Sequence, residues 1–446
     1  ALIISVNYLN AQYVTIPDLN FVNYLNQYYP NCMNGNQMDT TCSNITNQYL
    51  VVVAGRGITD LYGLQFFDSL KSLVAFDNNI TNLDHLPDNI EYLNLRENPI
   101  GQISTLPNSL TEIEFSNCTF DSINLPSSLK RFFYMGDSLI YIDSFPPNLE
   151  RLNLQHSSIS AIPTLPTGLK WLTLISNTSL NSITNLPTSL EQITITQNGI
   201  NLHNLDFTPL SNLDFLNISI NNLDSIPALL PSHRFDLDIS HNEITDWSNM
   251  PSELMFLDIR GCKIDSFNKI PSFVYLNRLY CGDNSLKSLD GLINTVGNLK
   301  IQGSFIEELK LPSSLSVLEV NYNHNILYID SFPSYLWKLI VKNTDLTTVP
   351  QLPNILKQLE LHNSNITCLP NLPSSITSLD LRNLNLSCLP NYVNAMNSNS
   401  YKIGNSSIPF YQMPFCTNDP VTNPYACDAV KGVEGYVFED DNSNCN

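Results

Sequence analysis

Three aspartates, Asp236, Asp238 and Asp258, form a concentrated group of titratable side chains in a repetitive part of the sequence. They lie on adjacent repeats and could come within about 5 Å of one another. Carboxylates in such a group could bind calcium or share a proton. Because further oxygen ligands are not assured nearby, we interpret them as solvated carboxylates of an acidic protein.

Motifs that support catalysis are absent from the sequence. It contains no GxSxG, HExxH, P-loop or GxGxxG pattern, and its seven histidines are scattered singly. His233 and His241 are close in sequence but have no cysteine partner that would complete a metal site. We therefore predict that this region is not an enzyme and has no metal site and no cofactor. The remaining alternative is an enzyme whose catalytic domain lies beyond residue 446.

The ten cysteines indicate disulfide chemistry more than metal or thiol chemistry. Six of them are clustered as candidate disulfide partners: Cys32 with Cys42, Cys368 with Cys388, and Cys416 with Cys427.

The cysteines within the repeats have two kinds of position. Cys368 and Cys388 are one repeat apart, so they either form a bridge between stacked coils or are two free buried cysteines. Cys118 and Cys262 occupy a conserved position of the repeat pattern within this chain, so we interpret both as structural residues and not as reactive thiols.

Charge and hydropathy restrict the partners and the location. The chain has 21 Lys and Arg against 41 Asp and Glu, a net charge of −20, and no basic run, which argues against nucleic acid as a partner. Residues 1–12 resemble the remnant of a secretory signal peptide with a cleavage position after Ala11; the alternative is a buried edge strand. The first six residues are too short an apolar stretch to span a bilayer. We expect a secreted or cell-surface protein.

The elements that position these side chains come from an internal repeat. The pattern LPxxLxxLxLxxNxIxxI recurs, with a clear copy starting at Leu86. Seventeen marker positions from Val51 to Leu379 have a mean spacing of about 20.5 residues. This period, with apolar residues at alternate positions, is typical of leucine-rich repeats. We predict a leucine-rich repeat solenoid of about 17 coils with a curved parallel β-sheet.

A polar ladder and short turns complete each predicted coil. Proline in nearly every turn excludes a helix there, so we expect a short extended or 3₁₀ convex side. Five places after each marker, a small polar residue should satisfy backbone groups inside the coil. These ladder residues are Asn78, Asn98, Cys118, Asp137, Ser157, Asn177, Asn198, Asn221, Asn242, Cys262, Asn284, Ser304, Asn323, Thr344 and Ser364.

Caps are expected at both ends of the array. Residues 16–25 predict a short amphipathic helix with Asp18 as its N-cap and Phe21, Val22 and Leu25 on its inner face. We divide the chain into a signal-peptide remnant, an N-terminal cap, the repeat array, a C-terminal cap or linker, and the start of a β-sandwich-like module. Their bounds are residues 1–12, 13–50, 51–391, 392–433 and 434–446.

Several of these motifs together resemble one protein family. The IPDLNFVNYL cap, the LP-type repeats, the CLPN ending and the GYVFEDDNSNC terminus look like the large leucine-rich surface proteins of Gram-negative bacteria that use the type IX secretion system. The resemblance implies an outer-membrane-associated multidomain adhesin. It also implies a partner in the secretion machinery and a sorting domain that would follow downstream.

The concave face of the array offers candidate ligand-binding residues. On each strand, the residues beside the inward leucines point to solvent. Aromatic and large apolar residues stand out there, and exposed apolar clusters are candidate interfaces. The candidates are Phe133, Met135, Trp171, Ile175, Phe256 and Tyr280. Alternatively, some of them pack against a flanking loop or a downstream domain.

We predict a monomeric binding or adhesion protein that recognises a protein or glycan ligand through this concave face. The competing hypothesis is a rigid structural spacer, or a secreted cargo segment of a larger surface protein, with no ligand of its own. A clustered aromatic patch favours binding, whereas an even coat of small polar residues would favour the spacer.

Overall fold

The computed structural model describes residues 12–402, except residues 102, 104, 230–232, 387 and 398–400. Parallel strands, about 17 in number, form a solenoid of about 16 turns that contains few helices. The predicted leucine-rich repeat solenoid is therefore confirmed. The described residues form two compact units, and the chain passes between them at residues 222–233.

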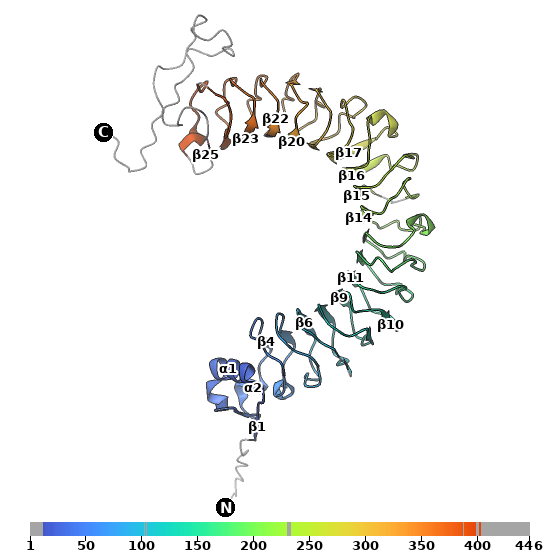
Figure 1. The fold of residues 1–446 in the computed structure, drawn as a ribbon, viewed down its shortest axis with the longest axis vertical. Helices are drawn as coiled ribbons and strands as arrows, with labels where there is room; N and C mark the ends of the chain where they lie inside the picture. Colours follow the sequence, from blue (N-terminus) through green and yellow to red (C-terminus); the bar gives the residue numbers. More distant parts are fainter. Residues whose placement is uncertain are drawn as a thin grey trace, which may run out of the picture. The chain divides into compact units, whose positions relative to one another are not determined.

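In each unit the strands lie side by side along one face, which we call the concave face, and the turns lie along the opposite face (Figure 1). The first unit contains β4 (Leu50–Val52), β5 (Ser72–Val74), β6 (Tyr92–Arg96), β7 (Glu112–Ser116), β9 (Arg131–Met135), β11 (Arg151–Gln155), β12 (Trp171–Ile175), β13 (Gln192–Thr196) and β14 (Phe215–Asn217). The second unit contains β15 (Phe235–Asp238), β16 (Glu253–Asp258), β17 (Tyr275–Tyr280), β18 (Asn298–Gln302), β20 (Val317–Asn323), β22 (Lys338–Thr344), β23 (Gln358–Ser364), β24 (Ser378–Asp380) and β25 (Tyr401–Lys402).

The marker residues set the register of this sheet. Leu152 lies opposite Leu172, and Leu339 lies opposite Leu359, so each marker meets the marker of the next coil. The marker and the residue two places on are buried, while the residues on either side of them are partly exposed. This two-residue alternation builds one apolar core along each unit and leaves the intervening side chains on the concave face.

The polar ladder is hydrogen-bonded and mostly buried, as the repeat pattern predicts; Asn198 and Asn221 are partly exposed, and Asp137 departs from the pattern. Asn98, Asn177 and Asn323 are at most 1% exposed, and their amides bond to backbone groups of the same and the neighbouring coil. Asp137 was expected on this ladder but is exposed. In its coil the hydroxyl of Tyr134, on the strand, accepts the N–H of Leu139 at 3.0 Å, so a residue at another position bonds the backbone there.

The face opposite the strands is mainly extended and turn-like, with short 3₁₀ turns η2 (Leu64–Phe66), η3 (Leu202–Asn204) and η4 (Phe267–Lys269). Two small parallel pairs add regular structure there. They are β8 (Ser122–Ile123) with β10 (Tyr141–Ile142), and β19 (Glu308–Leu309) with β21 (Tyr328–Ile329). The 3₁₀ turn η5 (Asn394–Asn397) lies between β24 and β25.

The N-terminal cap closes the open end of the first coil. It contains a small antiparallel sheet of β1 (Tyr13–Thr15), β3 (Gln37–Asp39) and β2 (Met33–Asn34), helices α1 (Leu19–Tyr28) and α2 (Ser43–Thr46), and the 3₁₀ turn η1 (Pro30–Cys32). The predicted helix and its N-cap are confirmed, because Asp18 accepts the N–H of Phe21 at 2.8 Å. Phe21, Val22 and Leu25 face the core as expected.

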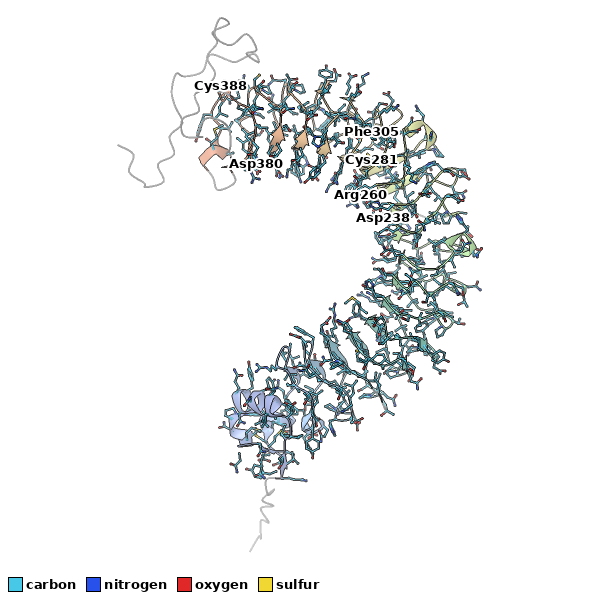
Figure 2. The ribbon with its side chains drawn as sticks, viewed as in Figure 1. Asp238, Arg260, Cys281, Phe305, Asp380 and Cys388 are labelled. Atoms are coloured by element: carbon cyan, nitrogen blue, oxygen red, sulfur yellow. A yellow bond between two sulfur atoms is a disulfide. The ribbon has the colours of Figure 1, made fainter. Side chains whose placement is uncertain are left out.

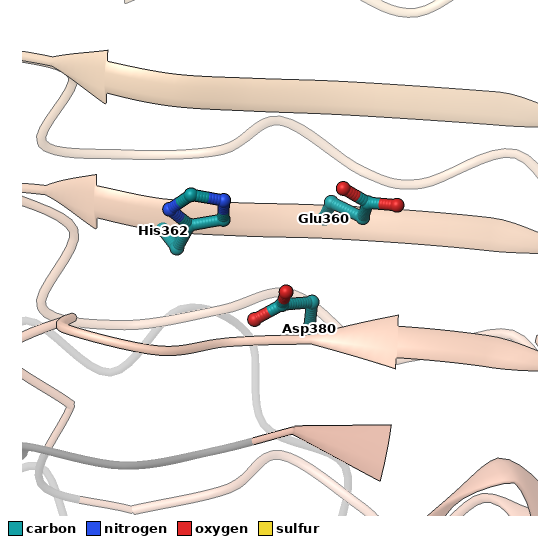
Figure 3. A group of neighbouring side chains, drawn as sticks. All are labelled: Glu360, His362 and Asp380. Atoms are coloured by element: carbon teal, nitrogen blue, oxygen red, sulfur yellow. The ribbon is translucent and has the colours of Figure 1, made fainter. Parts of the chain in front are cut away.

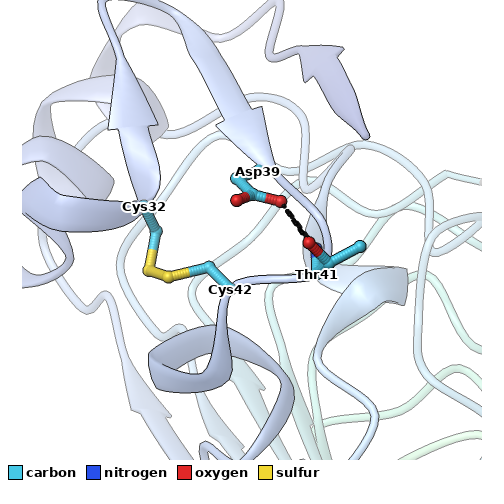
Figure 4. The surroundings of a disulfide bond; sticks show 4 residues. All are labelled: Cys32, Asp39, Thr41 and Cys42. Carbon is cyan, nitrogen blue, oxygen red and sulfur yellow. Dashed lines mark hydrogen bonds between the residues drawn. A yellow bond between two sulfur atoms is a disulfide. The ribbon is translucent and has the colours of Figure 1, made fainter. Parts of the chain in front are cut away.

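A disulfide joins Cys32 to Cys42 and ties η1 to the start of α2 (Figure 4). In the same loop, Asp39 accepts the hydroxyl of Thr41 at 2.7 Å. Cys368 and Cys388 are also disulfide-bonded. Cys416 and Cys427 lie outside the described residues.

Cys118 and Cys262 are free and buried, and burial raises the pKa of both thiols to about 12. Both are therefore protonated at neutral pH, which suits a structural ladder residue and not a nucleophile. Cys281 is buried and free as well, and its pKa is also raised by burial.

No helix in the described part of the chain has the length and apolarity needed to cross a membrane. The predicted signal-peptide remnant, apart from residue 12, and the predicted module at 434–446 lie outside the described residues.

Candidate binding surfaces

The predicted ligand-binding residues all lie on strands of the concave face and are partly exposed. Phe133 and Met135 are on β9, Trp171 and Ile175 on β12, Phe256 on β16 and Tyr280 on β17. The first four belong to the first unit and the last two to the second unit.

In the first unit, β11 separates the two predicted pairs. Gln155 pairs with Met135 of β9 on one side and with Ile175 of β12 on the other, so one strand separates these two apolar side chains. The guanidinium of Arg151 lies over the indole of Trp171, and that of Arg96 lies 4.7 Å from the ring centre of Phe133. The four candidates are therefore divided by polar side chains, and their aromatic faces are already in contact with cations.

In the second unit, the two predicted residues are in direct contact. The rings of Phe256 and Tyr280 meet edge to face, with centroids 4.8 Å apart. Arg278 lies 5.1 Å from the ring centre of Phe256, and the amino group of Lys300 lies 4.7 Å from that of Tyr280. Arg260 lies on the other side of Tyr280, at 5.8 Å. We call these five residues the Phe256 cluster.

Acidic side chains hold the cations of this cluster in place. Arg278 donates to Asp236 at 3.0 Å, Lys300 pairs with Glu319 at 3.1 Å, and Arg260 forms two short bonds with Asp258. Asp238 and Arg260 both lie on the concave side (Figure 2). The cluster is thus a network of two rings and three cations whose side chains are ordered before any partner binds, which lowers the entropy lost on binding.

These ion pairs also bear on the three aspartates of the sequence. Asp236 and Asp258 each have a guanidinium partner that occupies carboxylate oxygens a calcium ion would need. Burial raises the pKa of Asp238, and the nearby Asp258 raises it further. The arrangement fits charged anchors for arginine and not a calcium site.

Glu360, His362 and Asp380 form the one group among the described residues whose donor atoms lie close enough to hold a metal ion together, within 4.8 Å of one another. Glu360 and His362 come from β23, and Asp380 from β24 (Figure 3). Lys342 pairs with Glu360 at 2.6 Å, and Arg382 pairs with Asp380 at the same distance. Both carboxylates are therefore already neutralised, and we assign the group to the charged concave surface.

One surface was missed by the sequence analysis, and it lies where the cap meets the first strand. A pocket of about 460 Å³ is lined by Tyr24 and Tyr28 of α1, Leu50 and Val52 of β4, and Arg56, with Tyr29, Gln48 and Ala54 completing its walls. The signal for it was present in the sequence. In β4 the inward residue Val51 and the outward residues Leu50 and Val52 are all apolar. A strand with one exposed face needs apolar residues at its inward positions alone.

The 20-residue coil, the buried polar ladder and the strand-lined concave face define the class of protein: the fold is that of a leucine-rich repeat protein. No protein-family model matches the chain.

Known proteins support this class. YopM from Yersinia enterocolitica WA-314 is 26% identical and superposes with a TM-score of 0.58, over 78% of this chain and 81% of YopM. YopM from Yersinia pestis, a leucine-rich effector protein, is 23% identical with a TM-score of 0.52, over 82% of this chain and 99% of that one, which is a likeness of fold. Toll-like receptor 2 of Ovis aries is 27% identical over 264 residues, or 50% of this chain. The chain spans about a third of that receptor's length, since the match covers 33% of it.

Proposed function

We propose that this chain is a secreted or cell-surface binding protein that recognises a protein partner through the concave face of its second unit. The observation that carries the proposal is the Phe256 cluster. Tyrosine and arginine are the residue types that dominate binding energy at protein interfaces, especially beside other aromatic rings. The cluster presents them on the face that the repeat leaves free.

The fold and the covalent chemistry support this function. Leucine-rich repeat folds are suited to protein–protein interaction, since many coils contribute to one extended surface. The relatives include a receptor and an effector protein by name. The disulfide between Cys32 and Cys42 fits an oxidising environment outside the cytosol. Adhesion, export by the type IX route and a monomeric state belong to the same proposal, as does the lack of enzymatic activity in this region.

The experiment that tests this function uses residues 1–446 on an array of purified extracellular proteins and, in parallel, on a glycan array. Each binder is then measured by surface plasmon resonance with Phe256→Ala and with Tyr328→Ala. The second variant is the matched control, because Tyr328 is an exposed aromatic residue on the opposite face of the same unit. We expect a protein ligand whose Kd weakens at least about tenfold with Phe256→Ala and stays unchanged with the control.

Three results would contradict the proposal. Protein ligands that bind both variants equally would place the interface elsewhere. Glycans as the sole ligands would change the ligand class. A complete lack of ligands would favour the structural spacer.

A further inference from the structure

The pocket beside the N-terminal cap, which we call the Arg56 pocket, differs from the concave surface around it. It lies within the first unit and does not depend on the Phe256 cluster. Its walls are the rings of Tyr24 and Tyr28 and the aliphatic side chains of Leu50 and Val52, with Arg56 as its cation.

Arg56 occupies the ladder position of the first coil, five residues after the marker Val51, where later coils carry mainly small polar residues. Its neighbours Gly55 and Gly57 have φ angles of +67° and +69°, a conformation that favours glycine. The backbone N–H of Arg56 donates to Asn78 at 3.1 Å, so the backbone still follows the ladder. The side chain does not enter the core and is free to serve another purpose.

Among the described residues, the side chains that contact the Arg56 guanidinium are neutral. It lies 5.1 Å from the ring centre of Tyr24 and 5.4 Å from that of Tyr28. It donates to the hydroxyl of Tyr28 and to the side-chain carbonyl of Gln27, both at 3.3 Å. These contacts fix the orientation of the guanidinium, and none of them neutralises its charge.

Most other arginines of the concave face have a carboxylate partner; Arg151, which lies over the ring of Trp171, is the other one that forms no salt bridge within the described residues. Arg131 pairs with Glu112, Arg278 with Asp236 and Arg382 with Asp380. Within the part of the chain that the structure describes, no carboxylate forms a salt bridge with Arg56, although the chain carries a net charge of −20. A fixed, unpaired guanidinium matches the geometry of a carboxylate, which it binds through two parallel hydrogen bonds.

The apolar walls of the pocket are exposed beyond what the fold requires. Val51 and Val53 are fully buried in the core, whereas Leu50, Val52 and Tyr28 are 43%, 47% and 53% exposed. Adjacent exposed apolar side chains next to a charged group are the composition of an interface.

We propose that the Arg56 pocket binds a segment of a partner protein that carries a carboxylate next to an apolar side chain. The carboxylate accepts two hydrogen bonds from Arg56, and the apolar side chain packs against Leu50, Val52 and the ring of Tyr28. The aliphatic wall favours a peptide over an acidic sugar, whose hydroxyls would need polar partners there.

The experiment uses capped dipeptides as probes, acetyl-Leu-Asp-amide and acetyl-Phe-Asp-amide, with their Asn counterparts as uncharged controls. Binding to residues 1–446 is measured by ligand-observed NMR titration. We expect the Asp peptides to bind with a Kd on the order of 1 mM, as small ligands of this size do, and the Asn peptides to bind about tenfold more weakly.

Variants locate the binding. Arg56→Gln should weaken the Asp peptides about tenfold and leave the Asn peptides unchanged, while Val52→Ser should weaken both by a few-fold. Arg131→Gln is the matched control, since this arginine already has a carboxylate partner, and it should change neither. Unchanged thermal melting of Arg56→Gln establishes that the variant is folded.

Four results would overturn the proposal: equal binding of the Asp and Asn peptides, unchanged binding by Arg56→Gln, no peptide binding at about 10 mM, or Arg56-dependent binding of 3′-sialyllactose without any peptide binding. The last result would assign the pocket to an acidic sugar.

Discussion

Replacing Asp18 with alanine should destabilise the N-terminal cap by about 3 kcal/mol and loosen its attachment to the first coil. Asp18 is 8% exposed and caps α1 by accepting the N–H of Phe21. Its second oxygen accepts the N–H of Thr59 at 2.6 Å, the Thr59 hydroxyl at 2.7 Å and the N–H of Asp60 at 3.2 Å. Alanine would leave the buried N–H of Phe21 and the partly buried donors of Thr59 and Asp60 without this acceptor. Hydrogen exchange of the α1 amides, together with urea denaturation, measures the loss.

The same residue predicts a pH dependence with a defined sign. Burial alone would raise the pKa of Asp18, but the hydrogen bonds from Thr59, Phe21 and Asp60 outweigh it and lower the pKa below 3.8. A carboxyl group whose pKa is lowered by folding stabilises the folded state above its unfolded pKa. That stability is lost as the pH falls from about 3.8 through the folded pKa. The wild-type cap should therefore lose protection in this range, and Asp18→Asn should lack this component.

Asp206→Ala is the matched control for Asp18. Asp206 is also an aspartate with a lowered pKa, but its hydrogen bonds within the described residues come from Thr208 alone, in an exposed turn. The Asp206→Ala substitution should leave the urea denaturation midpoint unchanged. If Asp18→Ala melted like the wild type, the contacts between the cap and the first coil would not contribute to stability.

Periodicity explains why the coils, their register and the cap helix could be predicted from the sequence. A marker every 20 residues aligns Leu152 with Leu172 whatever the side chains on the concave face do, because backbone hydrogen bonds and burial decide the register. The ladder failed at Asp137 for a physical reason. In that coil the hydroxyl of Tyr134 accepts a backbone N–H from a core position, and counting residues from the marker cannot detect an acceptor at another position.

The concave surface was less predictable because its contacts run diagonally between strands. Phe256 of β16 pairs with Arg278 of β17 in the sheet, yet its ring contacts that of Tyr280, two residues further along β17. Which of these neighbours a ring contacts depends on rotamers and on the ion pairs that anchor the arginines. The Arg56 pocket was not predicted because Arg56, at the polar-ladder position of the first coil, departs from the repeat pattern. A departure at the end of an array gives the sequence no periodic signal.

Replacing Asn323 with alanine should destabilise the second unit by about 3 kcal/mol, because this side chain bonds two coils together. Asn323 is fully buried. Its carbonyl oxygen accepts the N–H and the hydroxyl of Ser304, both at 2.7 Å, and its amide donates to the backbone oxygens of Ile301 and Asn321. Alanine removes all four bonds and leaves polar groups buried without partners, at a depth where water cannot replace the amide.

The position of the loss distinguishes this prediction from general destabilisation. In a repeat array each coil contacts only its neighbours, so the effect should be largest in β18 and β20 and should fade with distance along the unit. Hydrogen exchange read strand by strand, with thermal melting of the same samples, measures both the size and the range. Asn354→Ala, at an exposed turn of the same unit, serves as the control and should change neither. A loss of less than about 1 kcal/mol, or one spread evenly over both units, would show that the ladder amide does not join its coils as the hydrogen bonds indicate.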